Sequence, residues 1–245
     1  MNIELQKILK IKIIRLFYIA ISLYYVAIVI TTRSSTNYFD PTFMIENSFS
    51  TLQWLPILLI LITAISFSMN YQYGVFKNDL YRVNGRIGYL LKKIAAIISI
   101  TIVTYLAITI LDFIVATLLF NDYITTIVIN GTLLWILGSF IENIMISLLV
   151  MLLTIMFRNA VLPICIGILY YLLVNLLGGA MSSLIDKAEV LKWNPLNMLN
   201  FKAELINSSI KNLTHLSLLE ILIAIVGYSL FYLFFALFIF RYQEL

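Results

Sequence analysis

The chain has 245 residues, of which 62% are hydrophobic and 11% charged, and its formal net charge is +4 at pH 7. Soluble domains contain about 45–50% apolar and about 25% charged residues, so this composition excludes a water-soluble enzyme and offers no basis for nucleic-acid binding. The single cysteine, Cys165, excludes an intrachain disulfide, and the single histidine, His215, argues against a histidine metal cluster or a Ser-His-Asp triad. We expect an integral membrane protein without a catalytic, metal or cofactor site of its own.

The apolar residues form long blocks that are hydrophobic on every face, rather than short segments of alternating polarity. This pattern predicts membrane-spanning helices and not barrel strands. The fold class is therefore all-α and polytopic, with one domain over residues 1–245. We expect a tilt or a break in the fourth of its six spans, because that block is 30 residues long and contains Gly131 and Gly138. The predicted spans cover residues 13–31, 52–69, 94–120, 127–156, 161–184 and 219–240.

Lysine and arginine residues divide unequally between the two sides of these spans, with eleven of the sixteen on one side. By the positive-inside rule this side is cytoplasmic, and six spans place both termini there. The chain is thus predicted to be a multi-pass protein of a bacterial cell membrane. The eleven cytoplasmic residues are Lys7, Lys10, Lys12, Arg15, Lys77, Arg82, Arg86, Lys92, Lys93, Arg158 and Arg241.

Two segments outside the spans are amphipathic. Residues 1–12 alternate isoleucine and leucine with lysine and glutamate at near-helical spacing, which predicts an interfacial helix on the inner leaflet. The alternative is a solvated cationic start that only fixes the topology. Residues 185–218 are predicted to be extracellular and to form a re-entrant or interfacial helical hairpin, with Trp193 and Phe201 as interfacial anchors.

The predicted cytoplasmic segment 70–93 is too long and too mixed in composition for a simple turn. Its apolar and aromatic residues recur at helical spacing, which predicts a short amphipathic helix that ends at Gly85. Such a helix fits a cleft on a soluble partner. It equally fits an interfacial helix without a partner. The recurring residues are Tyr73, Phe76, Leu80 and Val83, and Lys77, Asp79 and Arg82 lie on other faces.

The order of residues in this segment resembles a pattern that follows the second span of ABC-2-type transporter permeases. The residues that carry the resemblance are Gly74, Asn78, Arg86, Tyr89 and Lys93. An outer Asn-Pro-Leu segment, residues 194–196, and the cationic start extend the resemblance over most of the chain. The sequence departs from the family pattern at Asn70 and Gln72, where acidic residues are common, and this weakens any salt bridge there.

The resemblance implies a type V exporter-like permease fold whose first cytoplasmic loop contains a coupling helix. No Gly-x-x-x-x-Gly-Lys-Ser/Thr motif occurs in the chain, so a separate ABC-type ATPase would bind ATP and Mg²⁺. The implied assembly has two ATPase copies and a second permease chain, the same or related. The implied ATPase interface contains Tyr73, Gly74, Phe76, Lys77, Asp79, Leu80 and Arg82.

Three polar residues fall inside predicted spans: Asp112 in the third, and Glu142 and Asn143 in the fourth. An ionised side chain at the centre of a spanning helix costs about 2.5–3.5 kcal/mol on an insertion scale, so these residues need partners. They could line a transport path or act as a proton-linked element. Alternatively, they form structural hydrogen bonds between neighbouring helices, or a span end is shifted toward the interface.

Two functional hypotheses remain from different classes. In the first, the chain is the membrane subunit of an ATP-driven exporter of amphipathic or hydrophobic substrates, similar to small Gram-positive permeases for bacteriocin immunity or export of phenol-soluble modulins. In the second, it is a non-transporting sensor or immunity protein that binds a toxic peptide through residues 190–201. An intramembrane enzyme is disfavoured because the only histidine lies outside the spans.

Overall fold

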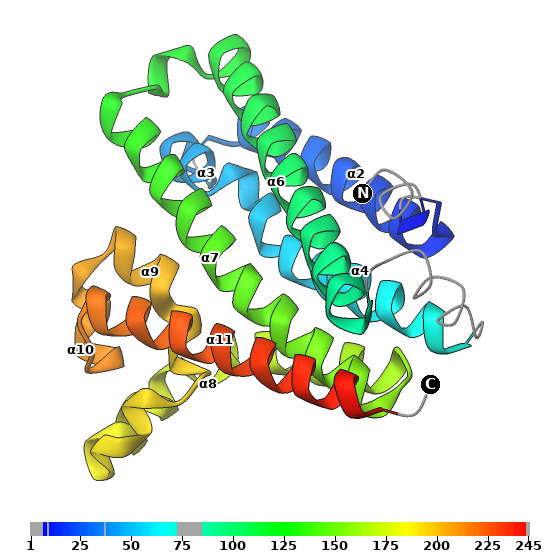
Figure 1. Ribbon diagram of the computed structural model, residues 1–245. Helices are drawn as coiled ribbons and strands as arrows, with labels where there is room; N and C mark the ends of the chain where they lie inside the picture. Colours follow the sequence, from blue (N-terminus) through cyan, green and yellow to red (C-terminus); the bar gives the residue numbers. More distant parts are fainter. Residues whose placement is uncertain (1–6, 9, 37, 73–84, 244–245) are drawn as a thin grey trace.

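The computed structural model describes residues 7–8, 10–36, 38–72 and 85–243, and these residues form helices and turns without any strand (Figure 1). Successive long helices run in opposite directions. As a result, the start of the first and the end of the last lie at the same end of the bundle (Figure 1). We call this the inner end, after the orientation predicted from the sequence. The six long helices are α2 (Lys12–Ser34), α4 (Leu55–Gln72), α6 (Gly85–Leu119), α7 (Thr126–Phe157), α8 (Val161–Lys187) and α11 (Leu218–Tyr242).

Among the described residues, five stretches are long and apolar enough to cross a membrane, which confirms a multi-pass, all-α membrane protein. They are α2, residues Ser48–Met69, α6, α7 and α11. Helix α8 has 27 residues, but its described apolar stretch, Val161–Val174, is shorter than the other five. The sixth crossing therefore stays a prediction.

Two features of the helices differ from the predicted spans. Helix α6 begins at Gly85 rather than at residue 94, because Arg86 and Lys93 have backbone carbonyl partners on neighbouring helices and can therefore sit in packed helical turns. Of the predicted cytoplasmic segment 70–93, residues 73–84 lie outside the described residues, and the flanking residues belong to α4 and α6. Of the two alternatives predicted for the fourth span, a tilt or a break, the break is wrong, because helix α7 is unbroken despite its glycines. At Gly138 the missing side chain admits the backbone of Lys202, so this glycine serves packing and not a break.

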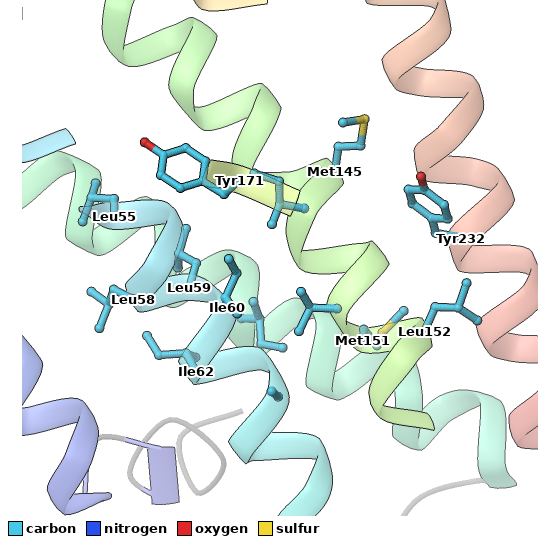
Figure 2. Close-up of a cluster of buried hydrophobic side chains, with 14 of the residues drawn as sticks. Leu55, Leu58, Leu59, Ile60, Ile62, Met145, Met151, Leu152, Tyr171 and Tyr232 are labelled. Carbon is cyan, nitrogen blue, oxygen red and sulfur yellow. The ribbon is translucent and has the colours of Figure 1, made fainter. Parts of the chain in front are cut away.

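The main core is one cluster of buried side chains from α2, α4, α6, α7, α8 and α11, and part of it lies where α4 packs against α7 (Figure 2). Leu58, Leu59 and Ile60 of α4 are almost completely buried, and they share one hydrophobic cluster with Met145 and Met151 of α7. Helix α7 also contacts α8, α9 and α11. In contrast, α2, α6 and α11 are mostly exposed along apolar faces, as expected for helices that face lipid.

The first outer segment folds into α3 (Pro41–Glu46) and the 3-10 helix η1 (Ser48–Gln53). Asp40 caps α3 by accepting a hydrogen bond from the Thr42 backbone N–H at 3.0 Å. Within η1, residues Ser48, Phe49 and Ser50 have φ of 49°, 48° and 60°, a left-handed conformation that costs about 1–2 kcal/mol per residue. The fully buried Phe49 ring offsets this cost, since it packs 5.6 Å from Tyr25 and 5.7 Å from Phe120 between ring centroids.

The second outer segment is folded onto the bundle and is not a free loop. The Tyr170 hydroxyl of α8 donates to the Pro195 carbonyl, and the Tyr228 hydroxyl of α11 donates to the Trp193 carbonyl, each at 2.6 Å. Phe201 is 1% exposed, so its predicted role as an interfacial anchor is wrong, whereas Trp193 is 40% exposed. The segment contains η3 (Glu189–Trp193), η4 (Asn197–Asn200), α9 (Phe201–Ile206), η5 (Ser208–Ile210) and α10 (Lys211–Thr214), and a further turn, η2 (Asn121–Tyr123), joins α6 to α7.

The predicted interfacial helix over residues 1–12 lies largely outside the described residues. Of its apolar residues, Ile8 and Ile11 are described: Ile8 is buried in the main core, and Ile11 is partly buried against it. The backbone N–H of Ile11 donates to the Ile8 carbonyl at 3.1 Å. Ile8 is therefore packed against the bundle.

Candidate coupling site and buried polar centres

The predicted ATPase interface falls on residues that the structure does not describe: Tyr73, Gly74, Phe76, Lys77, Asp79, Leu80 and Arg82 all belong to residues 73–84. The two borders of this segment are described. Helix α4 ends at Gln72, and α6 begins at Gly85 with a φ of +88°, a conformation that glycine adopts at low cost. The candidate coupling site is therefore defined by the contacts at these borders.

Arg86, one residue into α6, binds the end of α11. Its Nη1 donates to the backbone carbonyls of Arg241 at 2.8 Å and Gln243 at 2.6 Å. The last carbonyls of a helix lack partners within that helix, and a cation there also complements the helix dipole. Arg86 therefore fixes the start of α6 to the C-terminal end of α11.

Gln243 connects the same end of α11 to two further helices. Its Oε1 accepts a hydrogen bond from the Tyr71 hydroxyl of α4 at 2.8 Å, and its Nε2 donates to the Ile155 carbonyl of α7 at 2.9 Å. The Gln243 side chain is buried, so both bonds are shielded from solvent. We call Tyr71, Arg86, Ile155 and Gln243 the inner junction.

Tyr89 and Lys93 continue the contacts of Arg86 along one face of α6. The Tyr89 ring stacks on Phe240 of α11 with centroids 6.1 Å apart and an interplanar angle of 19°. Lys93 is 3% exposed, and its Nζ donates to the Ser66 carbonyl of α4 and lies 5.1 Å from the centroid of the Phe67 ring. These residues, quoted above for the family resemblance, hold α6 to α4 and α11. Gln243 and Tyr71 were missed, because the sequence gives no sign of a contact between residues so far apart.

Glu142 of α7 lies about 24 Å along the helix from Thr126, at about 1.5 Å per residue. It is 4% exposed, and its Oε1 accepts a hydrogen bond from the backbone N–H of Lys202 at 2.8 Å. The Lys202 Nζ lies 3.8 Å from Oε2, so the two charges form an ion pair. Glu142 thus ties α7 to the start of α9 in the second outer segment.

The other two polar residues predicted inside spans lie in separate surroundings. Asn143 donates from Nδ2 to the Tyr105 hydroxyl of α6, which is the kind of interhelical bond that the sequence suggested. Asp112 is 3% exposed and faces the hydroxyls of Tyr25 and Ser48, but neither of its carboxylate oxygens has a well-formed hydrogen bond among the described residues. The three residues therefore do not form one cluster.

Chemical groups that could hold a cofactor are sparse in the described part of the chain. No group of three or more His, Cys, Asp or Glu residues gathers there. His215 pairs with Asp186 at 3.3 Å near the outer end of α8, and Cys165 is an exposed residue of α8. Several described polar side chains join neighbouring helices, among them Arg86, Asn143 and Gln243.

Comparison with protein-family models shows the family to which the chain belongs. The family model described as ABC-2 family transporter protein matches residues 1–175, more than two thirds of the chain. This range includes the first four predicted spans, much of the fifth, and the candidate coupling segment. Comparison with curated proteins gave no match. The chain belongs to the ABC-2 family of transporter proteins, the membrane-embedded components of ABC transporters.

Proposed function

We propose that this permease works with a separate ABC-type ATPase that binds residues 73–82 at the inner end, and that ATP hydrolysis by this partner drives export. Membership of the ABC-2 family supports an ATPase partner. ATP and Mg²⁺ bind the partner in this proposal, because the chain has no P-loop of its own. The inner end is the cytoplasmic side in this proposal, in agreement with the excess of lysine and arginine there.

The observation that carries the proposal is the inner junction, which ties both borders of the segment 73–84 to one place. Tyr71 on one side bonds to the Gln243 side chain, and Arg86 on the other bonds to the Gln243 backbone. A partner that displaces this segment would thereby move α4, α6 and α11 together, and α7 through Ile155. Such contacts fit a segment that passes force from a partner to several helices. An interfacial helix without a partner would not need them.

The complete transporter in this proposal contains two permease chains, the same or related, and two ATPase subunits in a bacterial cell membrane. Substrates are amphipathic or hydrophobic, and cytolytic or antimicrobial peptides are one such class. The described spans support this class because their buried charges are few and are used between helices, as at Lys93 and at Glu142. Export as the direction follows the family resemblance.

The alternative, a sensor or immunity protein without transport, draws on the second outer segment. Its short helices are packed against α7, α8 and α11, and they leave Val190 83% exposed and Trp193 40% exposed. A toxic peptide could contact such a surface without any ATPase. The two proposals differ in whether the inner segment binds a partner.

Co-purification separates these proposals. The chain is co-expressed with the ABC-type ATPase encoded beside it and purified in mild detergent. We expect the two to co-elute, and we expect Phe76→Ala or Tyr73→Asp to separate them. The matched control is Tyr38→Ala at the outer end, where the side chain is 87% exposed, and it should leave co-elution intact. Co-elution that survives both inner substitutions would refute the coupling role of this segment, and absence of any bound ATPase would favour the sensor.

A further inference from the structure

A cavity of about 260 Å³ lies between the second outer segment and the bundle. Its walls come from η1, α7, α8, η4 and α9, so five elements meet around it. Polar and apolar surfaces contribute to it almost equally. The polar side chains are Gln53, Asn200 and Lys202, and the larger apolar ones are Trp135, Tyr171, Val174 and Leu199.

Among the described residues that line this cavity, Lys202 alone carries a charge, on its ammonium group. It lies 5.3 Å from the centroid of the Trp135 ring and 6.0 Å from that of Tyr171, and the side chain is 16% exposed. Cation–π contacts of this kind hold an ammonium in place without using its hydrogens as conventional donors. The aromatic rings therefore fix where the charge sits on the cavity wall.

The Lys202 ammonium makes no conventional hydrogen bond to the described residues. Glu142 Oε2 is 3.8 Å away, beyond hydrogen-bonding distance, and Oε1 of the same carboxylate already accepts the Lys202 backbone N–H. Within the described residues the Lys202 Nζ has no hydrogen-bond acceptor, although an ammonium has three donors. An anion that enters the cavity would meet these donors at short range.

We propose that this cavity binds the anionic head group of an amphipathic molecule, a carboxylate or a phosphate, against Lys202. The apolar part of the same molecule lies against Trp135, Tyr171 and Val174. The volume is somewhat below that of pockets for drug-sized ligands, about 300–1,000 Å³, so it accommodates the head group and the adjoining carbons while a longer tail extends outside. This inference names a ligand class for the proposed exporter, yet it concerns the permease alone and does not depend on the ATPase.

The positive charge of Lys202 disfavours a cationic amphiphile in this cavity. A quaternary ammonium often occupies an aromatic surface, but here Lys202 already lies over both rings. A second cation would be repelled at a few ångströms within a poorly solvated site. The Lys202 ammonium thus favours negative charge in the cavity, although the Glu142 carboxylate 3.8 Å from its Nζ weakens this preference. Gln53 and Asn200 add neutral polar groups around the head group.

The test uses Trp135 as the reporter. Trp54→Phe and Trp193→Phe leave Trp135 as the only tryptophan of the three in the chain. The purified permease in phosphatidylcholine nanodiscs is titrated with 2-bromododecanoate, whose bromine quenches nearby indole fluorescence and whose carboxylate should bind Lys202. The chain-matched cationic probe is (2-bromododecyl)trimethylammonium. We expect saturable quenching by the anion and only weak, non-saturating quenching by the cation.

Substitutions at Lys202 and at a control lysine test whether binding of the anionic probe depends on Lys202. Lys202→Met should raise the half-saturating concentration of the anion at least tenfold, whereas Lys202→Arg should change it less than threefold. Lys187→Met, at the exposed end of α8, should have no effect. Glu142→Gln, which removes the competing charge, should tighten binding of the anion. All variants are compared only after identical elution in gel filtration.

Three results would overturn the proposal: equal quenching by the two probes, an unchanged half-saturating concentration in Lys202→Met, or weaker binding in Glu142→Gln. A second titration in nanodiscs with phosphatidylglycerol identifies the source of the anion. Competition by this lipid would support a lipid phosphate as the occupant, and its absence would support a free amphiphile. A failure of the ATPase to co-purify would leave these measurements unaffected, so the two proposals fail separately.

Discussion

The Gln243 side chain accepts a hydrogen bond from the Tyr71 hydroxyl at 2.8 Å, although the two residues are 172 positions apart in the chain. This bond joins the end of α11 to the end of α4, directly beside the segment where an ATPase is proposed to bind. The adjacent bond from Gln243 Nε2 to the Ile155 carbonyl adds α7. Gln243, the last residue that the structure describes, is therefore part of the candidate coupling site.

Removing either member of this pair should weaken the inner junction. Tyr71→Phe deletes the donor, and Gln243→Ala also leaves the Ile155 carbonyl without its partner. A buried polar group left unpaired costs about 1–3 kcal/mol, so we expect Gln243→Ala to be the more destabilising change. Thermal unfolding of the two single variants and the double variant in detergent gives the coupling energy. Strictly additive effects would show that the bond contributes nothing.

Gly138 should tolerate no side chain. A Cβ there would lie 2.7 Å from both Cα and Cβ of Lys202, and backbone atoms have little room to move away. Gly138→Ala should therefore displace α9 and lower the stability by about 1–3 kcal/mol, as overpacking does. Gly227→Ala in α11 is the matched control, because nothing lies within 4 Å of the position that its Cβ would occupy. Equal melting temperatures for the two variants would disprove the close packing of α9 on α7.

The pair between Asn143 and Tyr105 permits a test by double substitution. Tyr105→Phe removes the acceptor of the buried Asn143 amide and should destabilise the protein by about 1–3 kcal/mol. Asn143→Leu in the same chain removes the unpaired amide and should recover much of this loss. Unfolding by heat in detergent measures both. If the second substitution gives no recovery, the hydrogen bond is not the reason for the polar residue in α7.

Glu204 predicts a dependence of stability on pH. Burial raises the pKa of this carboxyl above its ordinary value of 4.5, while the Thr214 hydroxyl donates to its Oε2 at 2.9 Å and opposes the rise. The folded protein thus binds the proton more tightly than the unfolded chain does. Its contribution to stability is full below pH 4.5 and is lost as the pH rises through the raised pKa.

Glu204→Gln should accordingly flatten the melting temperature above pH 4.5 and raise it at neutral pH relative to the parent chain. Glu189 is the control with the opposite sign, because its hydrogen bond from Lys192 lowers its pKa. Glu189→Gln should cost stability at neutral pH and have less effect in acid. A parent chain and a Glu204→Gln variant with identical pH profiles would contradict the burial of this carboxyl in the folded state.

The apolar blocks were enough to predict the helices, since a helix that is hydrophobic on all faces is stable chiefly within a membrane. The beginning of α6 was not predicted. Arg86 and Lys93 look like loop residues when read along the chain, and only contacts with α4 and α11 explain them. The local sequence predicts the length and polarity of the apolar part of this helix. Whether a charged residue can belong to the packed helix depends on a hydrogen-bond partner on another helix.

The same limit applies to the candidate sites. Glu142 stood out as an unusual residue within a span, but its partner Lys202 belongs to a segment 60 positions later. The left-handed turn at Ser48, Phe49 and Ser50 also had no local signal, because glycine is the usual residue for such angles. Both features depend on packing between distant segments, which one sequence does not reveal.

The contact between the inner segment and an ATPase is tested most directly by cysteine cross-linking. The native thiol is removed by Cys165→Ser, and Phe76→Cys or the outer control Tyr38→Cys is then introduced. In membranes that contain the co-expressed ATPase, Phe76→Cys should form a cross-link to it and should resist a membrane-impermeant maleimide added from outside. Tyr38→Cys should show the reverse. External labelling of Phe76→Cys, or cross-linking no greater than that of Tyr38→Cys, would contradict the proposed coupling site.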